Sequence, residues 1–218
     1  MKTTLICMMM LLGLATQAQT KTKVFSLSPM TKDTETVNGL VVGIGHFQNA
    51  PQTQRINGIN VDIMPLSPLV GFYSIMYGTP FTHQKFDDDI KIISNGLNLG
   101  ISGYLEGSSK HNGLGVTLYN AGHTSNGLTV NGLFNRSKQL HGLHIAGLSN
   151  ISSTSVGLNL AFYNHSDTMY GAQIGLLNSA GQVKGLQLGL LNRTNALSGL
   201  QIGLINVNGK RTLPFLNF

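Results

Sequence analysis

The chain has 218 residues, of which only 10% are charged, against about 25% in ordinary soluble domains, and it contains 27 glycines and no tryptophan. Its formal net charge is +6, and many basic residues fall singly in predicted turns without interleaved aromatic residues, which excludes the basic stripe of a nucleic-acid-binding protein. We therefore expect no nucleic-acid partner. These turn residues are Lys110, Arg136, Lys138, Arg193, Lys210 and Arg211.

Residues 1–18 have the three parts of a secretory signal peptide. Lys2 precedes the apolar run 5–15, and small residues before Gln19 suit cleavage. The apolar run is too short to span a bilayer as a helix, and no later segment offers about 18 uninterrupted apolar residues, so no transmembrane helix is expected. Cys7 lies within the signal, so the mature chain has no cysteine and no disulfide. Cleavage removes one charged residue, Lys2, and leaves 13 basic and 8 acidic residues, a net charge of +5.

Residues 19–218 are predicted to form a single β-repeat domain. Its first part, 19–110, carries a divergent Asn-Gly-Leu or Asn-Gly-Ile signature whose glycines are Gly39, Gly58 and Gly96, followed by Gly113. The spacings between these glycines are 19, 38 and 17 residues. Because 38 is twice 19, we expect one repeat unit to have lost its glycine within the apolar run 69–77.

The second part, 111–206, is a regular repeat of 14 or 15 residues. The unit Gly-Leu-Gln-Ile-Gly-Leu-Ile-Asn at 199–206 recurs upstream at intervals of fourteen residues. Two steps are one residue longer, and we interpret the extra residue as a β-bulge at Gly132 and at Gly147. A unit repeated at so short a period buries its inner face only against copies of itself, which favours a repeat or barrel over an enzyme. The units end at Asn120, Asn135, Asn150, Asn164, Asn178, Asn192 and Asn206.

Each unit is predicted to be a strand of about ten residues followed by a turn of four. Apolar and polar residues alternate with period two, which places Val183, Gly185, Gln187, Gly189 and Leu191 on one face and the intervening residues, from Lys184 to Asn192, on the other. Two glycines in eight residues disfavour a helix.

Two architectures can use this unit. A ten-residue strand advances about 33 Å, whereas four residues span at most about 14 Å, so successive straight strands must be antiparallel. This predicts an all-β antiparallel meander of about 12–14 short strands, closed as a barrel. The alternative is a flattened β-solenoid, in which each repeat contains two short strands and the asparagines stack in a ladder; the equal spacing of the units favours it.

The C-terminal residues 207–218 are predicted to form the last strand. Its Pro214 must lie at a sheet edge or a bulge. The signal peptide, the strand length and the terminal Phe218 together indicate an outer-membrane barrel, with Leu188 facing lipid between Leu186 and Leu190, and with Gln187 inside. A soluble sheet or solenoid with the leucines in its interior is the competing arrangement, favoured by the thin leucine band and the absence of an aromatic girdle.

The repeat Gly-[Leu/Ala]-Gln-[Ile/Leu]-Gly-Leu-[Leu/Ile]-Asn, with the ending 199–218, resembles the glycine- and leucine-rich surface-repeat proteins of Gram-negative bacteria. The resemblance is strong from about Gly113 to the C-terminus and weaker before it. It implies an outer-membrane or cell-surface address, and it supplies no catalytic residues.

No residue is predicted to form a catalytic, cofactor-binding or metal site. The acidic run 87–89 lacks spaced ligands, so we interpret it as a solvated loop. His141 and His144 lie three residues apart and therefore on opposite faces of a strand, where they cannot hold one ion together; His144 occupies the glutamine position of the repeat. Sequons at four repeat asparagines are interpreted as coincidental. They begin at Asn135, Asn150, Asn164 and Asn192.

Two functions remain open from the sequence. The first is a non-enzymatic outer-membrane or cell-surface protein, structural or pore-like, with outer-membrane lipid as its partner. The second is a secreted or surface-attached, adhesin-like module that binds an extracellular ligand or an envelope protein through rows of turn residues.

Overall fold

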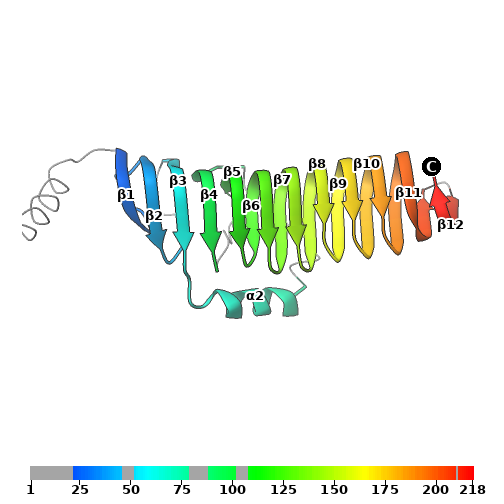
Figure 1. The fold of residues 1–218 in the computed structure, drawn as a ribbon, viewed down its shortest axis with the longest axis horizontal. Helices are drawn as coiled ribbons and strands as arrows, with labels where there is room; N and C mark the ends of the chain where they lie inside the picture. Colours follow the sequence, from blue (N-terminus) through cyan, green and yellow to red (C-terminus); the bar gives the residue numbers. More distant parts are fainter. Residues whose placement is uncertain (1–21, 46–51, 79–87, 102–107, 210) are drawn as a thin grey trace, which may run out of the picture.

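The computed structural model describes residues 22–45, 52–78, 88–101, 108–209 and 211–218, so the predicted signal peptide lies outside the described residues. The described strands form one twelve-stranded sheet in chain order. Neighbours from β1 to β11 are parallel, and β11 pairs antiparallel with β12. Figure 1 shows these strands side by side along one long axis. The all-β prediction is confirmed; the antiparallel meander closed as a barrel is wrong, and the alternative, a β-solenoid, is correct.

The elements are β1 (Thr22–Ser28), β2 (Thr36–Gly43), β3 (Gln54–Asp62), α2 (Ser67–Met76), β4 (Ile92–Gly100), β5 (Ser109–Thr117), β6 (Asn120–Asn131), β7 (Phe134–Ala146), β8 (Ser149–Leu160), β9 (Tyr163–Ile174), β10 (Leu177–Leu188), β11 (Leu191–Asn208) and β12 (Arg211–Asn217).

The strands are parallel because each repeat bends into a complete coil. In β10 and β11, Ala180 pairs with Thr194 and Gln182 pairs with Ala196, so the register passes over Gly181 at one corner. A second corner separates β10 from β11 at residues 189–190. The reach argument for antiparallel strands assumed a straight ten-residue strand. A strand that bends returns the chain to its starting side within fourteen residues.

The interior of the coil is largely polar, and the leucines lie outside it. Val183 and Gln187 are buried, whereas Leu188 is 39% exposed. The predicted placement of Gln187 inside and the leucines outside is therefore correct. The space around Gln187 is, however, the packed interior of a coil and not the lumen of a barrel. The competing arrangement, in which the leucines form an interior core, is wrong. The alternation fails beyond the corner at residue 189, because the chain reverses there and Asn192 becomes fully buried.

The repeat asparagines form the ladder expected of a solenoid. The Asn164 amide donates to Asn178 Oδ1 at 2.9 Å, and Asn178 donates to Asn192 Oδ1 at 2.9 Å. The second N–H of each amide reaches a backbone carbonyl across the corner, as from Asn178 to Leu188 O at 2.9 Å. Burial of so many amides is tolerated because they hydrogen-bond to one another and to the backbone.

A glutamine ladder runs beside the asparagines and ends at the last strand. Gln201 Nε2 donates to Gln187 Oε1 at 2.7 Å, and the buried Asn217 donates to Gln201 Oε1 at 3.0 Å. Asn217 thereby anchors β12 as the edge strand of the sheet. Pro214 lies in this edge strand, as predicted, where it removes a backbone donor and hinders further strand pairing.

A row of ten glycines runs along the solenoid, each paired in register with the glycine of the next coil. Their φ angles lie between 113° and 154°. A Cβ added at any of them would lie 1.9–2.3 Å from a carbonyl oxygen of the preceding coil. The row therefore requires glycine for both its backbone conformation and its close packing. Its members are Gly39, Gly58, Gly96, Gly113, Gly127, Gly142, Gly157, Gly171, Gly185 and Gly199.

Two local predictions are corrected by the structure. The apolar run 69–77 lies mostly in helix α2 and is not a divergent strand; β3 pairs directly with β4 across this excursion. The predicted bulges are also misplaced. Gly132 lies between β6 and β7 and Gly147 between β7 and β8, so the extra residue of each longer coil is accommodated at a corner rather than inside a strand.

Candidate functional site

Helix α2 forms one part of an apolar edge of the solenoid, which we call the lower edge. Figure 1 shows α2 below the ends of the central strands. Its small residues Ser67, Gly71 and Ser74 are the buried ones. A Cβ on Gly71 would lie 2.8 Å from Leu133 Cδ1, so glycine brings the helix close to the coil corners.

The large side chains of α2 are exposed. Residues 63–78 include no charged residue, and Pro68 lies in the first turn of the helix, where its missing N–H carries no cost. A helix that is apolar on every side is normally buried on every side. Here only the small-residue face is covered, while exposures of 60–70% are found at Leu69, Phe72, Tyr73, Met76 and Tyr77.

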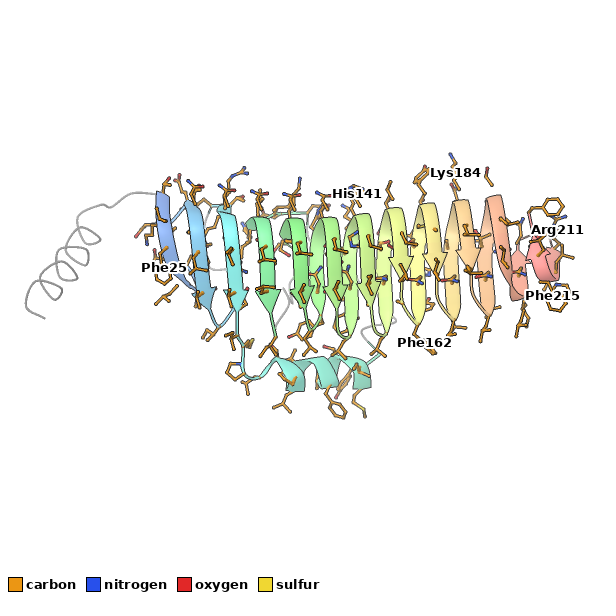
Figure 2. All side chains as sticks on the ribbon, viewed as in Figure 1. Phe25, His141, Phe162, Lys184, Arg211 and Phe215 are labelled. Atoms are coloured by element: carbon orange, nitrogen blue, oxygen red, sulfur yellow. The ribbon has the colours of Figure 1, made fainter. Side chains whose placement is uncertain are left out.

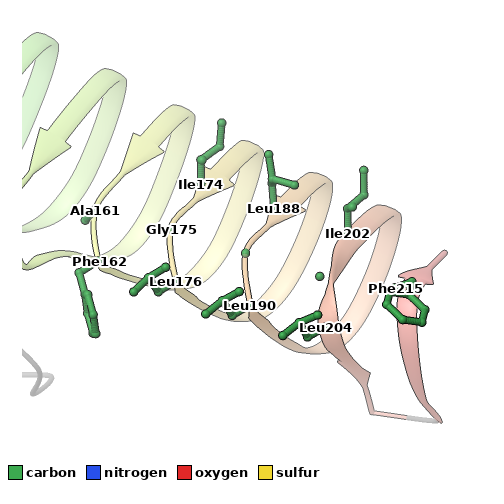
Figure 3. Close-up of a pocket in the computed structure, with 12 residues that line it drawn as sticks. Ala161, Phe162, Ile174, Gly175, Leu176, Leu188, Leu190, Ile202, Leu204 and Phe215 are labelled. Carbon is green, nitrogen blue, oxygen red and sulfur yellow. The ribbon is translucent and has the colours of Figure 1, made fainter.

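The second part of the lower edge is the row of corner residues beyond α2. Phe162, Leu176, Leu190 and Leu204 occupy equivalent positions in successive coils and are 44–58% exposed. Behind this row lies an open groove of 730 Å³, shown in Figure 3. Figure 2 shows Phe162 on the lower edge and His141 and Lys184 on the opposite, upper edge.

The upper edge carries a second asparagine ladder, which we call the outer amide ladder. It consists of Asn38, Asn57, Asn95, Asn112 and Asn126. Each amide donates to its predecessor at 2.6–2.7 Å, and His141 Nδ1 lies 2.9 Å from Asn126 Oδ1. These side chains are exposed or half-buried. The two edges thus differ: one is apolar and the other presents polar groups in a regular row.

The acidic run does not form a separate site. Asp87 lies outside the described residues. Asp88 Oδ1 pairs with Lys138 Nζ and lies 3.3 Å from His123 Nε2, while Asp89 pairs with Lys91. The hydrogen bond from Lys138 is the main reason that the pKa of Asp88 lies below its ordinary value. Within the described part of the chain, no group of three or more His, Cys, Asp or Glu side chains could hold a metal ion.

His141 and His144 lie on opposite sides of β7, as predicted. His144 is fully buried in the glutamine row, with Nδ1 2.8 Å from Thr129 Oγ1. A second interior imidazole, His111, was missed because its unit departs from the regular repeat; its Nδ1 lies 3.1 Å from Asn98 Nδ2. Burial lowers the pKa of each to about 4. Both imidazoles are therefore neutral members of the polar interior at neutral pH.

The sequons are buried in the folded protein. Asn135, Asn150, Asn164 and Asn192 each have 0% exposure, and their amides donate hydrogen bonds within the coil. This arrangement leaves them out of reach of a glycosylating enzyme after folding. The basic residues predicted to lie in turns are also placed differently. Those that the structure describes all lie in strands: Lys110, Arg136, Lys138, Arg193 and Arg211. Arg136 is 7% exposed, and Lys210 lies outside the described residues.

These features define a parallel β-solenoid with a polar interior, an apolar lower edge and a polar upper edge. No protein-family model, curated protein or solved structure matches the chain. None of the helices in the described segments has the length and apolar character needed to cross a bilayer.

Proposed function

We propose that this protein is a non-enzymatic, exported structural protein of the bacterial cell surface that attaches to outer-membrane lipid through its lower edge. The observation that carries the proposal is the orientation of α2, which buries its small residues and exposes its large apolar ones. The predicted signal peptide and the resemblance to surface-repeat proteins support the export step. A pore-like role has lost its basis, because it depended on the lumen of a barrel.

A lipid surface suits the chemistry of α2. Transfer of a large apolar side chain out of water contributes about 1.5–3 kcal/mol when burial is complete. Tyr73 and Tyr77 combine an apolar ring with a hydroxyl group, which fits the boundary between acyl chains and headgroups. Their ring centroids lie 4.3 Å apart on the exposed side. A short apolar helix held against a rigid sheet therefore acts as an interfacial anchor, with its axis along the membrane surface.

Charges placed on the exposed face of α2 are expected to abolish attachment. In the triple variant Leu69→Glu, Phe72→Glu and Met76→Glu, we expect at least a tenfold loss of co-sedimentation with phosphatidylethanolamine and phosphatidylglycerol vesicles, because each carboxylate would have to leave water. The control variant combines Val156→Glu and Tyr170→Glu on the upper edge, at 42% and 41% exposure, and keeps vesicle binding. The proposal is wrong if the native protein stays in the supernatant, or if the triple variant sediments equally well.

A second candidate function is an adhesin-like binding module, favoured by the outer amide ladder. The ladder repeats the same polar group at each coil, so it matches an extracellular polymer with regularly spaced hydroxyl groups, such as a polysaccharide. In the variant Asn95→Ala and Asn112→Ala, we expect at least a tenfold loss of retention on immobilised surface polysaccharide, because the row is interrupted at its centre. Ser198→Ala, an exposed position of the same row beyond the ladder, is the matched control. Equal retention of all three proteins would exclude this function.

A further inference from the structure

We infer that the groove on the lower edge is a binding site for a single extended acyl chain. It is lined on one side by Ile174, Leu188 and Ile202 and on the other by Leu176, Leu190 and Leu204. Figure 3 shows these two rows on either side of the corners, with Phe215 at one end. The lining is almost entirely apolar, which is the environment that an acyl chain requires.

Three of the four floor residues of the groove are glycines that cannot carry a larger side chain. A Cβ added to Gly175, Gly189 or Gly203 would lie 2.0–2.3 Å from the carbonyl oxygen of the preceding floor residue. The asparagine ladder lies directly beneath, with Asn178 Nδ2 2.5 Å from the Cβ position of Gly189. Glycine is therefore required at these three positions for the corners to stack, and it leaves no side chain between the two walls.

The length of the groove fits a chain that runs along the solenoid axis. It extends over four coils from Ala161 to Gly203 and then meets Phe215 in β12. At a strand spacing of about 4.8 Å, this distance is roughly 19 Å. Ala161 and Phe162 replace the usual glycine and leucine at the far end, so the smooth part of the groove has a boundary at each end.

The width and the polarity of the groove favour an acyl chain over a peptide. Leu188 and Leu190 are two residues apart, so the Cα atoms of the two walls are at most roughly 7 Å apart, whereas a helix with its side chains is about 10 Å wide. The backbone groups near the floor are already paired, with Gly189 N bonded to Ile202 O at 3.0 Å and Gly175 N to Leu188 O at 3.0 Å. A bound peptide strand would therefore bury its own N–H and C=O groups without partners, and an acyl chain has none.

The groove is continuous with the edge proposed to face lipid, and this indicates that the bound acyl chain comes from the membrane. The wall residue Phe162 lies on the same lower edge as α2 in Figure 2, and Leu176, Leu190 and Leu204 occupy the equivalent positions of the following coils. This part of the inference rests on the proposed function, because a protein lying on a bilayer brings the groove to the depth of the acyl chains. A fatty acid and a lipid tail share the chemistry that the groove recognises.

The test is binding of the fluorescent fatty acid cis-parinaric acid, without vesicles, to the native protein and to two single variants. We expect Leu190→Glu, at a wall position that is 50% exposed, to weaken binding at least tenfold. Leu69→Glu on α2 is the control and binds normally. If the groove recognises the acyl chain alone, palmitate and lysophosphatidylcholine each displace the probe. If palmitate alone displaces it, the natural ligand is a free fatty acid. Either pattern supports the site.

The dependence of binding on the length of the fatty acid gives a second readout, because a variant that only disturbs the fold does not shift the preferred length. Phe215 is 70% exposed and closes the groove, so Phe215→Ala is expected to shift the preference toward longer fatty acids while sheet circular dichroism stays unchanged. The inference is overturned if the native protein does not bind the probe, if Leu190→Glu binds it equally well, or if the profile of Phe215→Ala is unchanged. Because no vesicles are present, loss of α2-dependent membrane attachment leaves these outcomes unaffected, so the two proposals fail separately.

Discussion

Replacing Gly171 with alanine is expected to unfold the coils on both sides of it. Gly171 has φ 123°, and an added Cβ would lie 2.1 Å from the carbonyl oxygen of Gly157. Backbone strain alone costs about 1–3 kcal/mol, and relief of the contact separates strands β8 and β9, so we expect a total loss of at least about 5 kcal/mol. Thermal unfolding followed by circular dichroism, together with limited proteolysis to locate the opened coils, measures the effect.

The matched control is Gly115→Ala in β5. At this position the nearest atom to an added Cβ is His111 Nε2 at 3.2 Å, and φ is not positive. Equivalent positions in neighbouring coils carry Asn98 and Thr129, so a side chain is accommodated there and we expect a change of no more than about 1 kcal/mol. If Gly171→Ala melts within a few degrees of the native protein, the glycine row is not required for the stacking of the coils.

Acid is expected to destabilise the solenoid strongly through its two interior imidazoles. Burial lowers the pKa of His111 and of His144 to about 4, from the ordinary value of 6.5. Below pH 6.5 the unfolded chain takes up protons that the folded chain does not, so the free energy of unfolding is unaffected above pH 6.5 and falls as the pH drops toward 4. The difference corresponds to about 3 kcal/mol for each imidazole. Urea unfolding between pH 7 and pH 4 measures it.

The residues at equivalent positions of neighbouring coils supply the variants that test whether the two imidazoles cause the sensitivity to acid. His144→Gln inserts the residue of the glutamine ladder at its own position, and His111→Ser matches Ser94 and Ser125 in its row. We expect the double variant to lose most of the dependence on pH. The control His141→Gln removes a histidine on the outer side and leaves both buried imidazoles in place. A double variant with the same acid sensitivity as the native protein would show that other groups are responsible.

Much of the local order could be predicted from the repeat. The alternation around Gln187 identified which side chains point inward, and the constant position of Asn178 and its equivalents predicted a ladder in the solenoid alternative. Pro214 could be assigned to a sheet edge because it lacks a backbone donor. These predictions succeeded because each depends on one coil and its immediate neighbour.

The direction of the strands could not be obtained in the same way. Period-two alternation continues through the corner at Gly189 in the sequence, whereas the chain reverses there and places Asn192 inside. A straight strand and a bent strand show the same alternation of apolar and polar residues. The argument from chain reach therefore assumed a straight strand and selected the antiparallel topology, which is wrong. Helix α2 had a readable signal in Pro68 and the uncharged run around it, but its inverted orientation depends on packing against corners that come from distant repeats.

The lower edge was missed for a related reason. Leu190 was predicted to face lipid together with Leu188, as parts of one flat surface. Because the corner lies between them, they form the two walls of a groove, and only the stacking of four coils gives that groove its length. A site of this kind belongs to no single repeat.

The in-register stacking of the coils makes the length of this protein adjustable by gene duplication. Copying one fourteen-residue segment from the regular half adds one rung of about 4.8 Å and presents the same donors and acceptors to the rungs on either side. The terminal strand with Asn217 and Pro214 closes the stack regardless of how many rungs precede it. The length of the solenoid can therefore change in steps of one coil while its first and last strands keep the same sequence.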